Sequence, residues 1–542
     1  MLSKLAFEVY GLAAMTMRTK ILFAVVALGL LWPFPYFNSQ SRHGSINNPN
    51  EMIRVYAVAA LVEDGDWSID KPLKRWGWVD DKAERDGKMY SSKAPGTTLI
   101  GAPIYGLVHL VTGPLDKITL TWLLRVSTGI PCLLLLLWWL RREVLRLGSD
   151  EDLADGLVLG MGLGSMLYAY ALLFTGHLQA ALFAFGAWHF GRRRDRRGLL
   201  LFGLCAAATP AMEYPHALII LPLGLRFLWA EGWGGPTLIR RTGWALAGGL
   251  VPIGLTCWAQ SEMFGRFWRT GYSFLENQSY KTLHAEGFFG LHLPQPARLA
   301  NALFAADLGL FFFCPVLLLG LFAWIHAWRQ SKQEAGWILA LLALELLFIT
   351  AHAGWRGGWS VGPRYILPIV PFLALGLALI PLGRRWLLAG LLGLGLFSSG
   401  LPSALYPHLS DVFTNPWNSF LLPALRSGLV SYQPGPTLLA VNLGNAPLLI
   451  GLGIAAVFTA RLVARAEGVA ALFVALFCFT ALVVHLPERD PEAAASERCR
   501  LYRLWEPAPP QPDTPQALGH YHALRCEPKA ALKAYGLSQE KR

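Results

Sequence analysis

The sequence predicts an all-α polytopic membrane protein with about thirteen transmembrane helices. Hydrophobic residues make up 54% of the 542 residues, and charged residues make up only 15%. The apolar residues recur in runs long enough to cross a hydrocarbon core of roughly 30 Å. Arginine and lysine gather in every second loop between these runs, which is typical of a chain that crosses a membrane repeatedly.

The apolar runs cover most of the chain. No small-residue cleavage site follows the first run, so we expect it to be retained as an anchor and not removed as a signal peptide. Pro210 and Pro215 shorten or interrupt the runs near residues 184, 205 and 222, so the count can differ by one or two. The expected helices are centred near residues 28, 129, 164, 184, 205, 222, 253, 318, 343, 373, 393, 453 and 476.

The loops that follow the even-numbered helices are basic, and cytoplasmic loops keep the excess of Lys and Arg. This predicts a cytoplasmic N-terminus, which carries Lys4, Arg18 and Lys20, and an external C-terminal tail. The alternation of basic and non-basic loops is consistent along the whole chain only if the apolar stretch 97–113 lies on the outer face and does not cross the membrane. The net charge of +12 then follows from topology, and no nucleic-acid partner is expected.

Two units are predicted on this basis. Residues 1–486 form the membrane domain, and residues 38–118 within it form a first external loop with juxtamembrane helices. Residues 487–542 form a short external tail with too little apolar mass for a second enzymatic domain. Cys499 and Cys526 stand in that tail, where an oxidising compartment would allow a disulfide, whereas the other five cysteines lie in or near apolar runs and are expected to be packing residues.

The first external loop holds nine acidic and nine basic residues between Asn38 and Gly96. Pro49, Asn50 and Glu51 are expected to open a helix there. Glu51 has two readings: a first-turn carboxylate favoured by the helix dipole, or a general base or metal ligand at the membrane surface.

Several motifs resemble those of a known superfamily. The first external loop, with its acidic helix start, Arg54, a "G.W" element and Tyr90 in "YSSKAPG", resembles that of the C-type glycosyltransferases (GT-C). These include the protein O-mannosyltransferases and the lipid A aminoarabinose transferase. The stretch "WRGGWSVGPRYILPIVPFLAL", Trp355 to Leu375, resembles a signature of a bacterial branch near glycosyltransferase family 39. Two weaker matches follow the same order, at "LGLF..CP" from Leu308 and at "YPH..D...NP" from Tyr406.

The resemblance implies a GT-C-like fold in a bacterial inner membrane. It also implies an inverting transfer of a sugar from a polyprenyl-phosphate donor to a lipid, glycan or protein hydroxyl at the outer face. Lys93 and Arg364 would bind the donor phosphate, and Glu51 would be the catalytic base. The other candidate substrate-binding residues are Asn50, Arg54, Asp81, Asp86, Tyr90, His177, Trp355, Trp359 and His408.

The sequence departs from the family at the acidic pair, because Asn50 stands where the family has Asp. Glu51 would then act alone, or a carboxylate such as Asp80, Asp81 or Asp86 would act in its place. A divalent cation remains a candidate cofactor with no assigned ligands. No zinc spacing, Walker loop, Ser-His-Asp order or dinucleotide fingerprint is present in the sequence.

Three other functions stay open at the level of sequence. A transporter or flippase of lipid-linked glycans would need paired repeats with broken helices, and we find no second half that mirrors the first. An O-antigen ligase or polymerase would need the late outer segment 402–440 for its chemistry. A catalytically inactive assembly partner is compatible with the Asn50 substitution.

Overall fold

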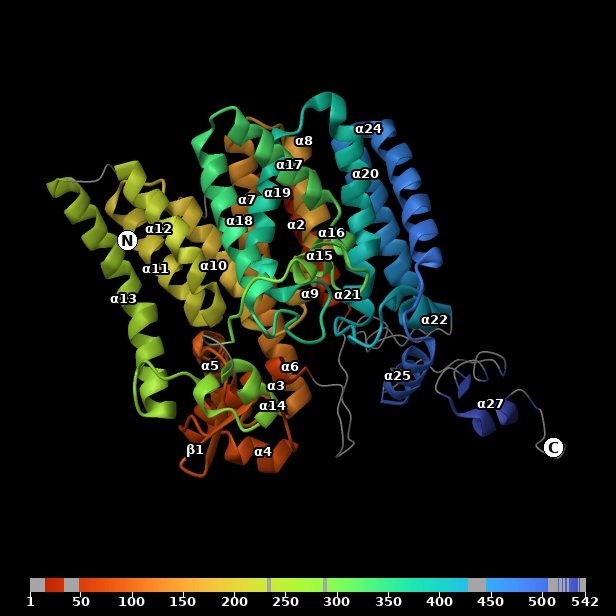
Figure 1. Ribbon diagram of the computed structural model, residues 1–542, viewed down its shortest axis with the longest axis horizontal. Coiled ribbons are helices and arrows are strands. Elements are labelled where there is room, and N and C mark those ends of the chain that lie inside the picture. Colours follow the sequence, from red (N-terminus) through yellow and green to blue (C-terminus); the bar gives the residue numbers. More distant parts are fainter. Residues whose placement is uncertain are drawn as a thin grey trace.

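The computed structural model describes residues 15–33, 48–231, 235–285, 290–426 and 445–504, with parts of 515–536 (Figure 1). The chain is predominantly helical, and its described residues contain a single two-stranded sheet. Lys4 and the segments 38–47 and 427–440 of two predicted outer loops lie outside the described residues.

The membrane domain is built from long apolar helices. Five helical runs are long and apolar enough to cross a membrane: Lys117–Arg146, Pro236–Phe264, Gln333–Ala351, Leu382–Leu405 and Ala446–His485. Shorter helices complete the bundle: α2 (Met17–Leu31), α8 (Glu151–Leu163), α9 (Met166–Ala171), α10 (Gly176–Phe190), α11 (Arg196–Met212), α12 (Ala217–Glu231), α16 (Leu310–Phe313), α17 (Val316–Arg329), η5 (Arg364–Ile369) and α19 (Val370–Gly376). The count of thirteen spanning helices stays a prediction.

The helix expected near residue 164 and the pair expected near 453 and 476 differ from simple spans. The one near residue 164 is broken, because α8 ends at Leu163 and Ser165 caps α9 through Leu167 N–H at 3.2 Å. At Gly164 a Cβ would lie 2.8 Å from the backbone nitrogen of Leu396, so η8 (Leu396–Gly400) approaches too closely for any side chain. The helix α24 (Ala446–His485) combines the helices expected near 453 and 476, and Arg465 breaks it with a φ of 50°.

Both arms of α24 pack along α20 (Arg385–Gly395). A Cβ on Gly390 would touch Ala471 on the second arm, and one on Gly393 would touch the carbonyl oxygen of Ala456 on the first arm. The two arms therefore run back along each other from the break, as two short helices would. The glycines of α20 are what allow this close approach.

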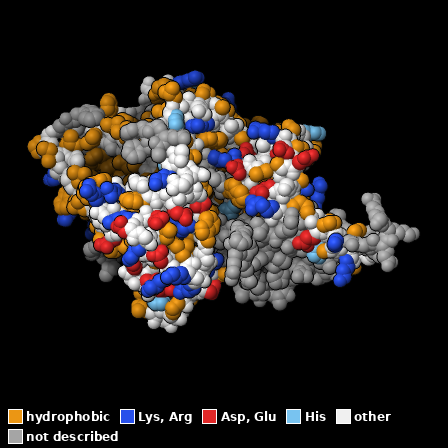
Figure 2. Space-filling model, turned by 60° about the horizontal axis from the view of Figure 1, so that its bottom comes forward, with side chains coloured by type: hydrophobic (Ala, Val, Ile, Leu, Met, Phe, Trp, Pro, Cys, Tyr) orange, Lys and Arg blue, Asp and Glu red, His pale blue; other side chains and the backbone are white. Residues whose placement is uncertain are grey.

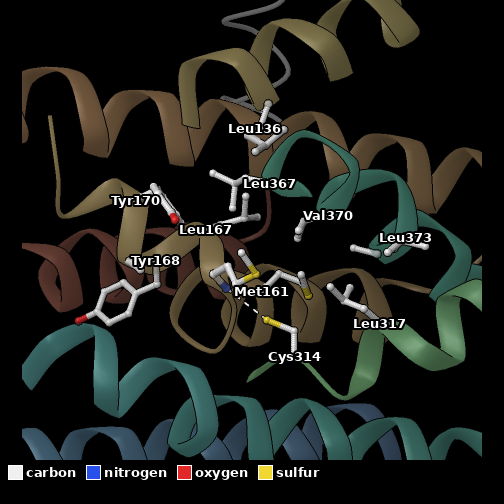
Figure 3. Close-up of a cluster of buried hydrophobic side chains, with 14 of the residues drawn as sticks. Leu136, Met161, Leu167, Tyr168, Tyr170, Cys314, Leu317, Leu367, Val370 and Leu373 are labelled. Carbon is white, nitrogen blue, oxygen red and sulfur yellow. Dashed lines mark hydrogen bonds between the residues drawn. The ribbon is translucent and has the colours of Figure 1, made fainter. Parts of the chain in front are cut away.

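The main hydrophobic core lies inside the bundle. Figure 3 shows Met161 and Leu167 from α8 and α9 packed beside Leu367 and Val370, with Leu317 across from them. The backbone N–H of Met166 donates to the Cys314 sulfur at 3.3 Å. Cys132 and Cys205 lie on bundle helices and Cys314 follows α16. All three are free thiols in or against the main core, as predicted for packing residues, whereas Cys478 is exposed.

The first external loop folds into a separate lobe at the bottom of Figure 1, with its own core around α3. Figure 2 shows acidic and basic side chains mixed on this lobe. Its elements are α3 (Pro49–Ala59), η1 (Ala60–Asp64), α4 (Asp70–Trp76), β1 (Lys82–Arg85), β2 (Lys88–Ser91), α5 (Gly96–Thr112), α6 (Lys117–Leu124), η2 (Arg125–Gly129) and α7 (Ile130–Arg146), the last three being one continuous run into the bundle.

Two later outer segments pack against the lobe and the bundle. The segment after α13 (Pro236–Phe264) contains η4 (Gly271–Phe274), α14 (Gln278–Ala285) and α15 (Pro296–Phe304). It contacts the end of α18 (Gln333–Ala351), where His292 N–H donates to the carbonyl oxygen of Ala351 at 2.9 Å. The segment 406–426 contains η9 (Trp417–Leu421) and α22 (Leu422–Arg426) and follows α21 (Leu401–Leu405).

The tail helix α25 (Pro491–Leu504) packs on this last segment. Glu497 accepts a hydrogen bond from Ser410 at 2.9 Å, and Tyr502 donates to the carbonyl oxygen of Phe420. A disulfide joins Cys499 to Cys526, which precedes α27 (Pro528–Ala534). The tail helix α25 is therefore attached to the segment 406–426 by contacts, and Cys526 is attached to α25 by a covalent bond.

Candidate active site

Lys93 lies at the end of a β-hairpin in the first external loop. Strands β1 and β2 pair antiparallel from Lys82 opposite Ser91 to Arg85 opposite Lys88, and the turn at Asp86 and Gly87 has positive φ at both residues, 52° and 75°. This is the conformation of a tight type I′ hairpin turn. The chain then places Lys93 in a buried position, where its ammonium lies 2.9 Å from the Asp81 carboxylate. Lys93 is thus not an ordinary interfacial lysine with its head in water.

Arg54 fixes the turn that follows Lys93. The Arg54 guanidinium is fully buried on α3 and donates to the carbonyl oxygen of Ala94 at 3.2 Å and to the Thr97 hydroxyl at 2.5 Å. Its other nitrogens donate to Asn50 Oδ1 at 3.2 Å and to Glu213 Oε1 at 2.5 Å. Arg54 and Asn50 therefore hold the Ala94–Thr97 turn in place.

Arg364 follows a loop rich in glycine. Gly357, Gly358 and Gly362 all have positive φ, between 73° and 88°. A Cβ on Gly357 would lie 2.6 Å from Arg364 Nε, so glycine is needed there for both its backbone and its lack of a side chain. Among the described residues Arg364 Nε has no hydrogen-bond partner, and the guanidinium carbon lies 5.4 Å from the Tyr365 ring centroid.

A chain of ring contacts connects Lys93 to Arg364. Lys93 Nζ lies 5.8 Å from the Tyr272 ring, and Tyr272 lies 4.5 Å from His284, centroid to centroid. His284 is 5.6 Å from His352, and His352 is 6.1 Å from Tyr365. The first external loop, the η4–α14 segment and the end of α18 thus meet around one cluster, which we call the polar cluster: Lys93, Tyr272, His284, His352, Arg364 and Tyr365.

The two histidines of the polar cluster are neutral near pH 7. Burial lowers the pKa of His352 to about 4, and the neighbouring His284 lowers it further. Burial also lowers the pKa of His284, and Lys93 adds to this effect. At neutral pH the positive charge of the polar cluster therefore resides on Lys93 and Arg364, with imidazole and phenol groups between them as neutral hydrogen-bonding partners.

Glu51 lies in an ion pair and away from open space. Arg125 in η2 donates to both carboxylate oxygens at 2.6 Å, and the backbone N–H of Phe174 donates to Oε1 at 2.7 Å. All three residues are buried. Glu51 thus joins α3, η2 and the segment just before α10.

His408 is buried close to this ion pair. Its Nδ1 lies 3.5 Å from the Asn48 side-chain nitrogen, and burial lowers the pKa of its imidazole to about 4. The late outer segment thus reaches the start of α3. Its neighbour Asn415 serves a structural purpose, because its side chain donates to the carbonyl oxygens of Val483 and Leu486 at the end of α24.

Of the remaining residues predicted from the sequence, His177 lies beside the polar cluster, and the others make contacts elsewhere. His177 is buried beside Tyr365, at 6.0 Å between ring centroids, and so borders the polar cluster. Asp86 is at the exposed hairpin turn, with 79% of its side chain accessible, and Tyr90 packs on Phe264 instead. Trp359 donates to Asp411 at 3.0 Å, and Trp355 packs at the edge of the main core.

Sequence reasoning missed Tyr272, His284, His352 and Tyr365. Tyr365 stands inside the motif Trp355 to Leu375 but was given no role, and the other three are single aromatic or histidine residues with no spacing pattern. Within the described ranges, no three His, Cys, Asp or Glu side chains come together in a way that could hold a metal ion. The candidate divalent cation therefore gains no ligand set from the described residues.

Comparisons with known proteins give a distant likeness. No protein-family model matches the chain, and no curated protein matches it. Among solved structures, ArnT from Cupriavidus metallidurans bound to undecaprenyl phosphate is 14% identical, with 89% of this chain and 79% of that chain covered and a TM-score of 0.49. Arabinosyltransferase EmbB from Mycobacterium smegmatis is 13% identical, with coverages of 90% and 42% and a TM-score of 0.41.

The archaeal oligosaccharyltransferase AglB from Archaeoglobus fulgidus, in complex with an inhibitory peptide and a dolichol-phosphate, is 11% identical, with coverages of 94% and 63% and a TM-score of 0.38. Because every TM-score is below 0.5, the case for a function rests on the side chains of the polar cluster.

Proposed function

We propose that the chain is a membrane glycosyltransferase that moves a sugar from a polyprenyl-phosphate donor to an acceptor hydroxyl at the outer face of the membrane. The observation that carries this proposal is the convergence of Lys93 and Arg364 on one polar cluster. The two residues come from segments far apart in the sequence, and both are the donor-phosphate candidates that the sequence predicted.

The charges of the polar cluster suit a phosphodiester. Lys93 has one carboxylate partner, Asp81, at 2.9 Å, whereas the described residues include no carboxylate in an ion pair with Arg364. A guanidinium presents several donors in a fixed plane and an ammonium acts as a point charge, so each is a suitable donor to phosphate oxygens. The neutral histidines add no further positive charge beside them.

The helix that begins beside Lys93 supports a lipid-linked donor. Leu107, Leu110 and Val111 on α5 are 71%, 83% and 86% exposed. Such a face is stable only against lipid or another apolar surface. A polyprenyl chain lying in the membrane beside α5 would bring its phosphate to the Lys93 turn at the helix start.

The transfer would break the bond between the sugar anomeric carbon and the donor phosphate oxygen. Lys93 and Arg364 would stabilise the negative charge that develops on the leaving phosphate. Attack by the acceptor oxygen from the opposite side of the anomeric carbon would invert its configuration. Glu51 is the base predicted from the sequence, but Arg125 and Phe174 already donate to its oxygens, which favours a different proton acceptor beside the polar cluster.

Donor binding tests the proposal. We would reconstitute the protein in lipid nanodiscs and measure binding and turnover of a panel of radiolabelled polyprenyl-phosphate sugars. Lys93→Ala and Arg364→Ala should each weaken donor binding about 10- to 100-fold, because each removes a charged hydrogen bond worth roughly 1.5–3 kcal/mol. Lys88→Ala is the matched control, since Lys88 is an exposed lysine of the same hairpin, paired with Asp66.

The outcomes separate the competing functions. Wild-type protein that binds no polyprenyl phosphate overturns the proposal. Binding that survives both substitutions overturns the phosphate assignment, and donor binding without turnover of any acceptor favours the inactive assembly partner. Movement of intact donor across the bilayer would instead indicate a flippase.

A further inference from the structure

Four ionisable side chains form a line from the polar cluster into the helical bundle. His177 Nε2 lies 3.7 Å from Glu213 Oε1, the His177 and His216 ring centroids are 5.9 Å apart, and His216 Nδ1 lies 3.6 Å from Glu345 Oε1. They come from the first turn of α10, the α11–η3 junction, η3 (Tyr214–His216) and α18. All four are buried.

Most of their polar atoms make no hydrogen bond to a described residue. Neither ring nitrogen of His177 or His216, and neither carboxylate oxygen of Glu345, makes a hydrogen bond to any described residue. Buried polar atoms are paired in the great majority of cases, so each exception calls for an explanation. Ionisable groups within a membrane-spanning helix such as α18 are costly and usually functional.

A structural role explains the burial of only one of the two carboxylates in the line, Glu213. Glu213 is paired with Arg54 at 2.5 Å, so its burial is compensated. At Gly176 a Cβ would lie 2.2 Å from the carbonyl oxygen of Met212 and 2.9 Å from Glu213 Oε1, which is how α10 brings His177 up to Glu213. Glu345 has no lysine or arginine in the described salt bridges and faces only His216.

His177 also borders the proposed donor site. Its ring lies 5.5 Å from Tyr170 and 6.0 Å from Tyr365, centroid to centroid. The titratable and charged groups around it, on every element packed against it, are Arg54, Lys93, Tyr170, Glu213, His216, Arg364 and Tyr365. His177 is therefore the member of the line that an acceptor bound beside the donor phosphate would meet.

We propose that His177 accepts the proton of the acceptor hydroxyl, that the negative charge of Glu345 stabilises the protonated ring, and that His216 is a positioning residue that packs between them. This inference rests on the proposed function. As the acceptor O–H bond breaks, its proton passes to an imidazole nitrogen of His177 and its oxygen bonds to the anomeric carbon. The electron pair of the broken bond to phosphate stays on the phosphate oxygens beside Lys93 and Arg364, and the proton later returns to water.

The pH dependence of turnover tests this inference. In nanodiscs, with the donor that binds best in the panel, we would measure kcat, KM and donor Kd from pH 5 to 9. His177→Gln should lower kcat about 10²- to 10⁴-fold, the usual contribution of a general base, with donor Kd unchanged. Glu345→Gln should lower kcat less and shift the acid limb of the profile to lower pH, because loss of the carboxylate destabilises the protonated ring.

The control is a buried carboxylate elsewhere in the bundle. Asp155 is buried and accepts hydrogen bonds from Arg141 and Thr19, remote in the fold from the polar cluster. Asp155→Asn should lower thermal stability and leave the pH profile in place. If Glu345→Gln does not fold, His216→Gln tests the same line, because it removes the ring that lies between Glu345 and His177.

The result that would overturn the inference is a wild-type pH profile and kcat in the Glu345 and His216 variants. Full activity of His177→Gln would overturn it as well. The failure of the proposed function is distinct, since wild-type protein would then bind no donor and Lys93→Ala would change nothing. In that case the assignment of His177 falls together with the proposed function.

Discussion

At the scale of single residues, two buried ion pairs organise the outer end of the molecule. Arg54 ties Glu213 to the turn after Lys93, and Arg125 holds both oxygens of Glu51. Both pairs start from α3, which is buried along its length. A buried charge is tolerated only while its partner is present, so each pair fixes the segments it joins.

Substitution of Glu51 distinguishes a structural role in the ion pair with Arg125 from a role as general base. Glu51→Gln leaves the Arg125 charge buried without a carboxylate, which should destabilise the fold by about 3–5 kcal/mol. Thermal unfolding measures this loss, and kcat per folded molecule measures chemistry. If the role of Glu51 is only structural, kcat per folded molecule stays within a few-fold of wild type. A fall of several hundred-fold without loss of stability would instead show that Glu51 is the base.

At the scale of elements, the start of α5 sets the position of Lys93. Helix α5 begins at Gly96 directly after the Lys93–Pro95 turn. A Cβ on Gly96 would lie 2.4 Å from the carbonyl oxygen of Ala211, at the end of α11. The backbone of α5 therefore contacts α11 with no room for a side chain, and this contact fixes the Lys93 turn against the bundle.

We expect Gly96→Ala to weaken donor binding, because α5 must move away from Ala211 and carry the Lys93 turn with it. Gly106→Ala is the matched control on the same helix, since a Cβ there meets nothing within 4 Å and Ala favours a helix over Gly by about 1 kcal/mol. The Gly106 variant should bind donor normally and be equally or more stable. Equal donor affinity in both variants would contradict the role given to the α5–α11 contact.

The elements also show what sequence patterns can and cannot predict. Apolar runs located the helices, since burial in lipid demands them, and the break at Gly164 was missed because it depends on the approach of η8 from a distant segment. Motif order selected Lys93 and Arg364. It did not find Tyr272 or His352, because an isolated aromatic or histidine gains meaning only when folding brings it beside a charge.

At the scale of the whole molecule, the disulfide in the tail bears on which side of the membrane holds the polar cluster. The disulfide between Cys499 and Cys526 requires an oxidising compartment to persist. The tail helix α25 packs on the segment 406–426, and that segment reaches α3 through His408 and Asn48. The tail, the late segment and the first loop thus lie at one end of the molecule, and the oxidised tail favours the external side for all three.

Site-specific labelling tests this orientation. In a Cys478→Ser background, which removes the free cysteine that is exposed, we would place single cysteines at Lys88 in the hairpin and at Lys332 between α17 and α18, both exposed. The basic-loop pattern puts seven crossings between these positions, so they should face opposite sides. A membrane-impermeant maleimide should label Lys88→Cys in intact spheroplasts and Lys332→Cys only after lysis. Labelling of Lys332→Cys alone in intact spheroplasts would invert the topology, place Lys93 and Arg364 in the cytoplasm, and exclude a donor that is used at the outer face.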